Sequence, residues 1–274
     1  MTLNCKGQLI SLEQPRVMGV LNITPDSFYD GGRYQQPAEV LKQAEKMLIE
    51  GATFIDVGAY SSRPGADHVP EAEELSRILP IIDLLLKEFP EVLLSIDTFR
   101  SNVARECIAA GAALINDISG GSLDGQMIST MGNLKVPYII MHMRGTPQTM
   151  NGLTDYKDLM ESVMLYFSEK IALAREAGVI DLILDPGFGF AKTLEQNYEL
   201  LKNLNLMLHL DYPILVGVSR KSMIYKLLEQ GPEEALNGTT ALHMYSLTKG
   251  AKILRVHDVK EAMECMRLYQ QLSE

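Results

Sequence analysis

Three segments of the chain repeat one short pattern, and this pattern restricts the fold more than any other feature. In each segment a Gly-Ala pair follows a stretch with helical spacing, and a polar residue stands five positions after the glycine. The glycine can end a helix because it accepts a positive φ, and the residues after the alanine have the apolar character of a short buried strand. The three segments are Gly51-Ala52 before Asp56, Gly111-Ala112 before Asn116, and Gly250-Ala251 before Arg255.

About eight strand–helix units of this kind follow one another, which is typical of a (β/α)8 TIM barrel. The first strand, residues 17–21, is apolar on both faces, as in a parallel sheet that is covered on both sides. Residues 1–12 alternate around Lys6-Gly7 and predict a short N-terminal β-hairpin at the bottom of the barrel. No internal boundary is visible, so we expect one domain over residues 1–274. The alternative is a doubly wound open sheet, which would need a more polar edge strand.

The spacing of apolar residues and the positions of Gly and Pro predict the individual elements. Helices are expected at residues 37–50, 70–88, 101–110, 122–132, 156–178, 194–208, 222–229, 235–249 and 258–272. Strands are expected at residues 17–21, 53–57, 91–96, 112–115, 136–141, 182–184, 213–218 and 252–254.

Composition narrows the functional classes. The chain has 274 residues, 46% of them hydrophobic, and can bury a sizeable core. A net charge of -10 without a basic run argues against a nucleic-acid surface. Cys5, Cys107 and Cys265 form no Cys-x-x-Cys pair, which argues for a reducing compartment and against structural zinc. With no targeting leader and no apolar run of about 20 residues, we expect a cytoplasmic protein that does not engage membranes.

Polar residues stand at the end of nearly every predicted strand. Taken singly, Asp97 and Asp185 fit helix caps, Asp56 fits a structural ion pair, and His142 fits a supporting role. In a barrel, however, all these strand ends meet at one mouth, where buried carboxylates and amides require partners. The full set is Asn22, Asp56, Asp97, Asn116, His142, Asp185, Ser219 with Lys221, and Arg255 with His257.

The chemistry of this set suits a heteroaromatic ligand. Carboxylates such as Asp97 and Asp185 accept from neighbouring ring N–H groups, Asn116 can donate and accept, and Lys221 can donate to a ring carbonyl. Arg255 can bind phosphate with its guanidinium or stack on a ring. Together with Arg63 and His257, Lys221 and Arg255 indicate an anionic substrate for an otherwise acidic protein.

Two loops allow two interpretations each. Residues 187–192 match neither a Walker A loop nor G-x-G-x-x-G. They form either a tight strand exit or a segment in which Phe190 and Lys192 line the pocket. Residues 61–66 form either a plain linker or a loop that folds over a ligand, and the nearby Asp56 favours the second reading for Arg63.

Taken in order, these motifs resemble the dihydropteroate synthases, a family of pterin-binding enzymes. The resemblance covers nearly the whole chain, and no single motif in it is as specific as the series. The motifs are Gly19-Val-Leu-Asn22-Ile-Thr-Pro-Asp-Ser-Phe28, Asp56-Val-Gly58, Ser62-Arg63-Pro-Gly65, Ser95-Ile-Asp97-Thr98, Asn116-Asp117, Asp185-Pro-Gly-Phe-Gly-Phe190, Ser219-Arg-Lys221-Ser222 and Arg255-Val-His257.

The resemblance implies a transferase of folate biosynthesis that joins p-aminobenzoate to 6-hydroxymethyl-7,8-dihydropterin diphosphate and releases diphosphate by a dissociative substitution. It also implies a homodimer, built here from the last two helices, and a target of sulfonamides.

By similarity, the catalytic residues are Asp97, Lys221, Arg255 and Arg63. The pterin is held by Asp97, Asn116, Asp185 and Lys221, with Arg255 stacked on it. The diphosphate is bound by Asn22, Arg63, Arg255 and His257, with Asn22 as a ligand of Mg2+. The p-aminobenzoate is framed by Ser222, Phe190, Pro64, Phe28 and Ser62, and Met141 belongs to the substrate-binding set. The loops after the first two strands, with Asp30 in the first, are expected to close over the site.

One stretch departs from the family pattern. Tyr60-Ser61-Ser62-Arg63-Pro64 stands where the family often has Glu-Ser-Thr-Arg-Pro, so the role of Tyr60 and the response to sulfonamides stay open. One rival function is methyl transfer from methyltetrahydrofolate to a corrinoid protein, which would not need the loops after the first two strands. A second rival is a non-catalytic barrel, against which the intact Asn22, Arg63, Lys221 and His257 argue.

Overall fold

The computed structural model describes residues 1–23, 36–60 and 69–273. The strands are β1 (Thr2–Cys5), β2 (Gln8–Ser11), β3 (Arg16–Asn22), β4 (Phe54–Gly58), β5 (Leu93–Asp97), β6 (Leu114–Asp117), β7 (Tyr138–Met141), β8 (Leu182–Asp185), β9 (Leu215–Val216) and β10 (Ile253–Val256). The helices are α1 (Gln36–Glu50), α2 (Glu71–Glu88), α3 (Ser101–Ala109), α4 (Met127–Leu134), α5 (Leu159–Glu176), α6 (Leu194–Lys202), α7 (Ser222–Tyr225), α8 (Leu236–Thr248) and α9 (Val259–Ser273), with short 3₁₀ helices η2 (Met150–Gly152), η3 (Leu204–Leu210) and η4 (Pro232–Glu234).

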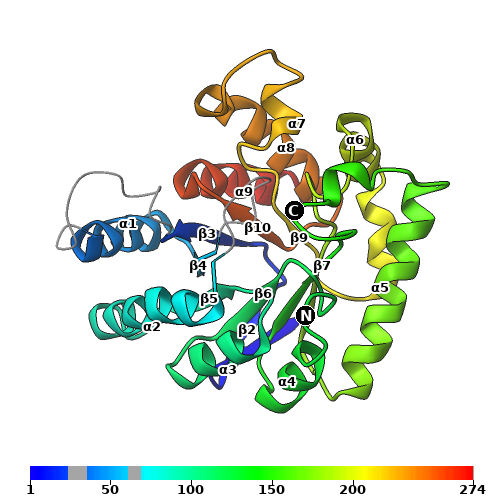
Figure 1. Cartoon of the computed structure of the whole chain (residues 1–274). Helices are drawn as coiled ribbons and strands as arrows, with labels where there is room; N and C mark the ends of the chain where they lie inside the picture. Colours follow the sequence, from blue (N-terminus) through cyan, green and yellow to red (C-terminus); the bar gives the residue numbers. More distant parts are fainter. Residues whose placement is uncertain (24–35, 61–68, 274) are drawn as a thin grey trace.

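Eight parallel strands form a barrel, in the order β8-β7-β6-β5-β4-β3-β10-β9. The two ends of this row meet, because Leu184 of β8 bridges Ile214 and its amide donates to the carbonyl of Pro213 at 2.9 Å. Helices surround the ring of strands (Figure 1). The predicted (β/α)8 barrel is therefore confirmed, and the alternative of an open sheet is wrong.

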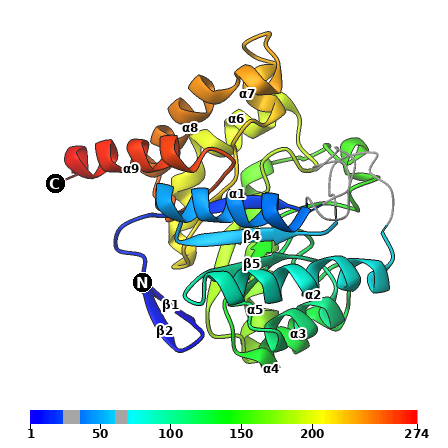
Figure 2. The same ribbon diagram turned by 90° about the vertical axis from the view of Figure 1, so that its left-hand side faces the viewer.

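The N-terminal hairpin, β1 and β2, is confirmed and lies at one end of the barrel (Figure 2). It buries Leu3, Cys5, Ile10 and Leu12 against one apolar side chain from each barrel strand. We call these eight strand residues the floor of the barrel. The floor consists of Met18, Phe54, Leu93, Leu114, Ile139, Ile183, Leu215 and Ile253.

The outer faces of the strands carry a separate apolar layer against the helices. Leu21 and Val57, for example, pack in one cluster with Val40 of α1 and Ile82 of α2. Strand residues of the floor are absent from this cluster, so alternate positions along each strand face opposite sides of the sheet. Within the described ranges, no helix combines the length and apolar character of a membrane span.

The glycines of the repeat end helices as predicted. Gly51, Gly111 and Gly250 have φ angles of 104°, 106° and 96° and directly follow the ends of α1, α3 and α8 or their cap residues. This left-handed conformation turns the chain back into the next strand at little steric cost only for glycine.

Four elements differ most from the prediction. The helix expected at 222–229 ends at Tyr225, as the short α7. The helix expected at 194–208 is divided: α6 ends at Lys202, where the side chain of the next residue, Asn203, donates to the carbonyl of Glu199 at 3.0 Å, and η3 follows. The strand expected at 213–218 is shortened to β9, since Pro213 has no amide for the ladder. The helix expected at 122–132 begins only at Met127, because the side chain of Asp124 accepts from the amides of Gln126 and Ser101 and so holds the residues before the helix in a turn.

We predict that the hairpin contributes to the stability of the barrel. Leu3→Ala removes a side chain that is 2% exposed and should lower the free energy of unfolding by about 2–5 kcal/mol. Leu9→Ala, in the same hairpin but 69% exposed, is the control and should change it by about 0.5 kcal/mol or less. Urea unfolding followed by circular dichroism measures both, and equal values would show that the hairpin is not part of the core.

Candidate active site

The strand residues two positions beyond the floor face the same interior, because side chains alternate along a strand. This second interior layer lies on the side of the floor away from the hairpin, toward the carboxyl ends of the strands. Whereas the floor is apolar, five of the eight positions here are polar or charged. The layer consists of Val20, Asp56, Ser95, Asn116, Met141, Asp185, Gly217 and Arg255.

Asp56 is the centre of this layer and is fully buried. Its Oδ1 accepts a hydrogen bond from Ser95 Oγ at 2.5 Å. Its Oδ2 accepts from Asn116 Nδ2 at 3.0 Å and from Arg255 Nε at 2.7 Å. The carboxylate is thus satisfied by three donors from three different strands, which fixes the orientations of Asn116 and Arg255.

Arg255 joins two carboxylates. Besides its contact with Asp56, its Nη2 lies 3.0 Å from Asp97 Oδ2. Burial alone would lower the pKa of Arg255, but the charges of Asp56 and Asp97 raise it, so the guanidinium stays protonated. Burial raises the pKa of Asp97 to about 7, with Arg255 opposing the shift and Asp56 adding to it. Asp97 therefore titrates near neutral pH.

Asp185 and Lys221 form a second charged group of the interior. Asp185 Oδ1 accepts from the amide of Gly187 at 2.8 Å. Lys221 donates to the carbonyl of Phe188, and its Nζ lies 4.9 Å from the ring centroid of Phe190. Burial raises the pKa of Asp185, and Lys221 opposes that shift. Burial lowers the pKa of Lys221 to about 8, opposed in turn by Asp185, so the site holds an amine that can lose its proton in mild alkali.

Lys192 organises the loop at residues 187–192 from below. It is 9% exposed, and its Nζ lies 3.0 Å from each of His142 Nδ1, Gly187 O and Phe190 O. Burial and the charge of Lys192 lower the pKa of His142 to about 2, so the imidazole is neutral. Burial also lowers the pKa of Lys192 to about 7. The supporting role expected for His142 agrees with this geometry. Lys192 thus braces the backbone of the loop, whereas the ring of Phe190 lies beside Lys221.

The last two strand ends are tied together. Ser219 Oγ lies 3.1 Å from His257 Nδ1 and also accepts from the amide of His257 at 3.1 Å. Arg220 has a φ of 53° and a bidentate ion pair with Asp258, at 2.8 Å for both contacts. The ion pair fixes the residues on either side of Arg220, including Lys221. A Cβ on Gly217 would lie 4.0 Å from Lys221 Nζ and 3.9 Å from Arg255 Cβ, so both side chains lie near Gly217.

Asn22 and Asp97 direct oxygens to one place above Gly58. A Cβ on Gly58 would lie 3.6 Å from Asn22 Oδ1 and 3.7 Å from Asp97 Oδ2. Amide oxygens are among the ligands that Mg2+ prefers, so Asn22 Oδ1 has the chemistry to help hold a hard cation, whereas Asp97 Oδ2 is already paired with Arg255 Nη2 at 3.0 Å. Among the described residues no group of three His, Cys, Asp or Glu side chains could hold a metal ion.

The structure brings most of the predicted site residues to one end of the barrel. Phe28, Asp30, Ser62, Arg63 and Pro64 lie outside the described residues. Those placed around the interior are Asn22, Asp97, Asn116, Met141, Asp185, Phe190, Lys221, Ser222, Arg255 and His257.

Two participants were not in the predicted binding set. Asp56 was predicted at the mouth, with a structural ion pair as the alternative; it forms an ion pair with Arg255 and also positions Asn116. Ser95, its partner, was named only as part of the motif Ser95-Ile-Asp97-Thr98 and was given no role. Ser95 stands two residues before Asp97 on one strand, so the alternation that selects Asp97 also selects Ser95.

Comparison with known proteins finds relatives that match nearly the whole chain. Residues 18–257 match the family described as "Pterin binding enzyme". The dihydropteroate synthase of Escherichia coli K12 is 44% identical over 98% of this chain and 96% of its own. The Yersinia pestis dihydropteroate synthase structure with a sulfonamide drug superposes with a TM-score of 0.93 at 42% identity, covering 100% of this chain and 99% of that one. The Xanthomonas albilineans dihydropteroate synthase structure with 4-aminobenzoic acid has a TM-score of 0.92 at 37% identity, covering 99% and 98%.

Identity of this extent, over a barrel of the same architecture, assigns the family. The chain belongs to the pterin-binding enzymes and, among them, to the dihydropteroate synthases.

Proposed function

We propose that this chain condenses p-aminobenzoate with 6-hydroxymethyl-7,8-dihydropterin diphosphate and releases diphosphate, the reaction of folate biosynthesis that names its relatives. The observation that carries the proposal is the second interior layer, where acid, amide and basic groups converge above an apolar floor. Such a layer offers both acceptors and donors to one flat ligand, as a pterin requires.

In this proposal the pterin lies between Asn116, Asp185 and Lys221. Asp185 accepts from ring N–H groups, Lys221 donates to the ring carbonyl, and Asn116 is held in place by Asp56 at 3.0 Å. The Lys221 ammonium leaves the carbonyl of Phe188 for the ligand. Asp97 contributes negative charge near the pterin methylene, and Arg255 lays its guanidinium against the ring.

The diphosphate binds to the cationic side of the mouth. Arg255 remains charged at all relevant pH values because two carboxylates stabilise it. His257, exposed at the end of β10, is oriented by Ser219 and adds a donor. We assign Arg63 to the same group from the family resemblance. These donors favour departure of a dianionic leaving group, because they are already in place before charge develops.

We further propose that Mg2+ accompanies the diphosphate, held by Asn22 in the space above Gly58. When bound, the ion would neutralise charge on the leaving group, as is usual for Mg2+ at phosphates.

The reaction proceeds by dissociation in this account. The bond from the methylene carbon to the diphosphate oxygen breaks, and the electron pair leaves with diphosphate. The resulting cation is delocalised over the pterin and favoured by the nearby charge of Asp97. The neutral amine of p-aminobenzoate then forms the new C–N bond and releases one proton to solvent. The protein needs no covalent nucleophile, and its work is positioning and electrostatics.

The p-aminobenzoate site is assigned to the side of the mouth that carries Phe190 and Ser222, with Met141 beneath. Phe190 packs on the same apolar cluster as Met141, so the two form one continuous surface. By resemblance, Phe28, Ser62 and Pro64 complete this site. We propose that sulfonamides, such as the one bound in the Yersinia pestis relative, compete for it.

Incubation with the pterin diphosphate, p-aminobenzoate and Mg2+ should release diphosphate and form dihydropteroate, and chelation of Mg2+ should slow the reaction. Asp185→Asn keeps an acceptor for the Gly187 amide but removes the charge, and should lower kcat/KM about a hundredfold. The exposed Asp83→Asn is the control and should behave as wild type. No diphosphate release from the wild type, or methyl transfer instead, would overturn the proposed function.

We predict a narrow pH optimum. Asp97, with a pKa of about 7, must be ionised to favour the cation, so kcat/KM for the pterin diphosphate should fall as pH drops below about 7. Lys221, with a pKa of about 8, must be protonated to donate, so kcat/KM should fall again above about 8. The Asp97→Asn variant should have a lower kcat/KM at every pH, and its pH–rate profile should lack the fall below about pH 7. If that fall persists in this variant, it belongs to another group.

We propose a homodimer through α8 and α9, in a cytoplasmic protein whose three cysteines are buried and free. These helices carry exposed apolar side chains: Tyr245 of α8 is 40% exposed, and Leu268 and Leu272 of α9 are 62% and 80% exposed. Exposed apolar side chains of this kind favour association. Sedimentation velocity should give twice the mass of one chain, and Leu268→Lys should shift the species toward monomer. A monomer in the wild type at micromolar concentration would exclude the proposal.

A further inference from the structure

Arg100 carries a buried charge for which the reaction has no assigned use. It stands three residues after Asp97, at the start of α3, and is 8% exposed. Its guanidinium forms an ion pair with Glu74 in the first turn of α2, and its Nη2 donates to the carbonyl of Val69 at 2.6 Å. Leaving either member of such a pair alone in the interior is costly, so the pair fixes the segments that carry it.

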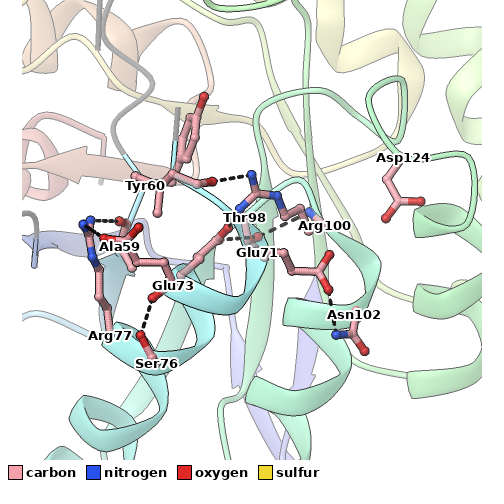
Figure 3. Close-up of polar contacts among 12 residues, drawn as sticks. Ala59, Tyr60, Glu71, Glu73, Ser76, Arg77, Thr98, Arg100, Asn102 and Asp124 are labelled. Atoms are coloured by element: carbon pink, nitrogen blue, oxygen red, sulfur yellow. Dashed lines mark hydrogen bonds and ion pairs between the residues drawn. The ribbon is translucent and has the colours of Figure 1, made fainter. Parts of the chain in front are cut away.

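The ion pair connects three segments around the second strand–helix connection. Glu74, fully buried, also accepts from Thr98 Oγ1 at 2.7 Å, and Thr98 is the neighbour of Asp97. On the N-terminal side of residues 61–68, Arg77 of α2 donates to the carbonyl of Ala59 (Figure 3). The chain is therefore held on both sides of residues 61–68, at Ala59 and at Val69.

The guanidinium of Arg100 also faces two aromatic rings. Its carbon Cζ lies 5.5 Å from the ring centroid of Tyr60 and 5.1 Å from that of Phe99. The two rings meet edge to face, with centroids 5.2 Å apart and an interplanar angle of 89°. Gln148, from the connection after β7, donates to the hydroxyl of Tyr60 at 3.3 Å. Figure 3 shows Tyr60 and Arg100 close together.

This aromatic pair is continuous with the surface assigned to p-aminobenzoate. Phe99 packs against the apolar cluster that contains Met141, and Phe190 packs against the same cluster. Phe99 and Phe190 thus lean on one shared apolar cluster, through which the position of one ring can affect the surroundings of the other.

We propose that Arg100 is a positioning residue for the arylamine side of the site: paired with Glu74, it holds the rings of Tyr60 and Phe99, and through them the wall that selects p-aminobenzoate. The inference rests on the proposed function. It assigns Tyr60 a task that a carboxylate at this position would not perform, since a ring packs on the planar guanidinium and on Phe99 at once.

The chemistry of arginine is required for this arrangement. A planar fork can bind Glu74 and the carbonyl of Val69 while its carbon Cζ stays 5.5 Å and 5.1 Å from the centroids of the two rings. A lysine ammonium keeps the charge but has no plane to stack and no fork to span both partners. Arg100→Lys therefore removes the positioning while it leaves the ion pair with Glu74 possible.

The test compares four variants by steady-state kinetics with each substrate varied separately. Arg100→Lys and Tyr60→Ala should each raise the KM for p-aminobenzoate about tenfold, while the KM for the pterin diphosphate changes less than about twofold. Tyr60→Phe keeps the ring and should remain close to wild type. Arg105→Lys, an exposed arginine on the same helix that contacts Asn102, is the matched control and should have no effect.

The double variant Arg100→Lys, Tyr60→Ala should be no worse than the more impaired single variant, because both changes remove the same contact. Equal rises in both KM values, additive losses, or a fall in melting temperature with unchanged kinetics would each overturn the inference. If Arg100→Lys does not fold, the comparison of Tyr60→Ala with Tyr60→Phe decides the question. An inactive wild type would instead refute the proposed function, so the two failures are distinguishable.

Discussion

The buried carboxylate of Asp56 is the constraint on which the site depends. A charge removed from water must be fully paired, and Asp56 obtains its partners from β5, β6 and β10. The same contacts that satisfy Asp56 hold Asn116 and Arg255 in the orientations a ligand would use. The site is therefore preorganised by a residue that lies beneath it, and the position of the Arg255 charge is set by folding rather than by ligand binding.

The sequence alone predicts most of the barrel and much of the site, because both follow from local rules. The glycines at 51, 111 and 250 mark helix ends, and alternation places Asp97, Asn116 and Asp185 at one mouth. What it does not predict depends on contacts between distant residues. The break after α6 lies at Asn203, whose side chain donates to the carbonyl of Glu199, and the three donors of Asp56 come from three other strands. Lys192 is a similar case, since only the folded loop shows that it braces the backbone.

The departure from the family pattern at Tyr60 also becomes intelligible in three dimensions. The sequence alone does not explain why a tyrosine stands where the family often has glutamate. In the fold, Tyr60 is buried against Phe99 and faces Arg100, whose charge is already neutralised by Glu74. A second carboxylate is not needed there, and an aromatic ring fills the space. The substitution is thus compatible with a complete site elsewhere in the mouth.

The layering of the interior has a consequence for how this molecule can fail. In β4, Phe54 belongs to the floor and Asp56 to the second interior layer. In β10, Ile253 belongs to the floor and Arg255 to the second interior layer. A slip of one residue in the pairing of either strand would turn both kinds of side chain toward the helices at once. Apolar packing and ligand recognition use the same face of each strand, so a one-residue slip disrupts both together. Selection for activity and selection for correct assembly therefore act on one geometric variable.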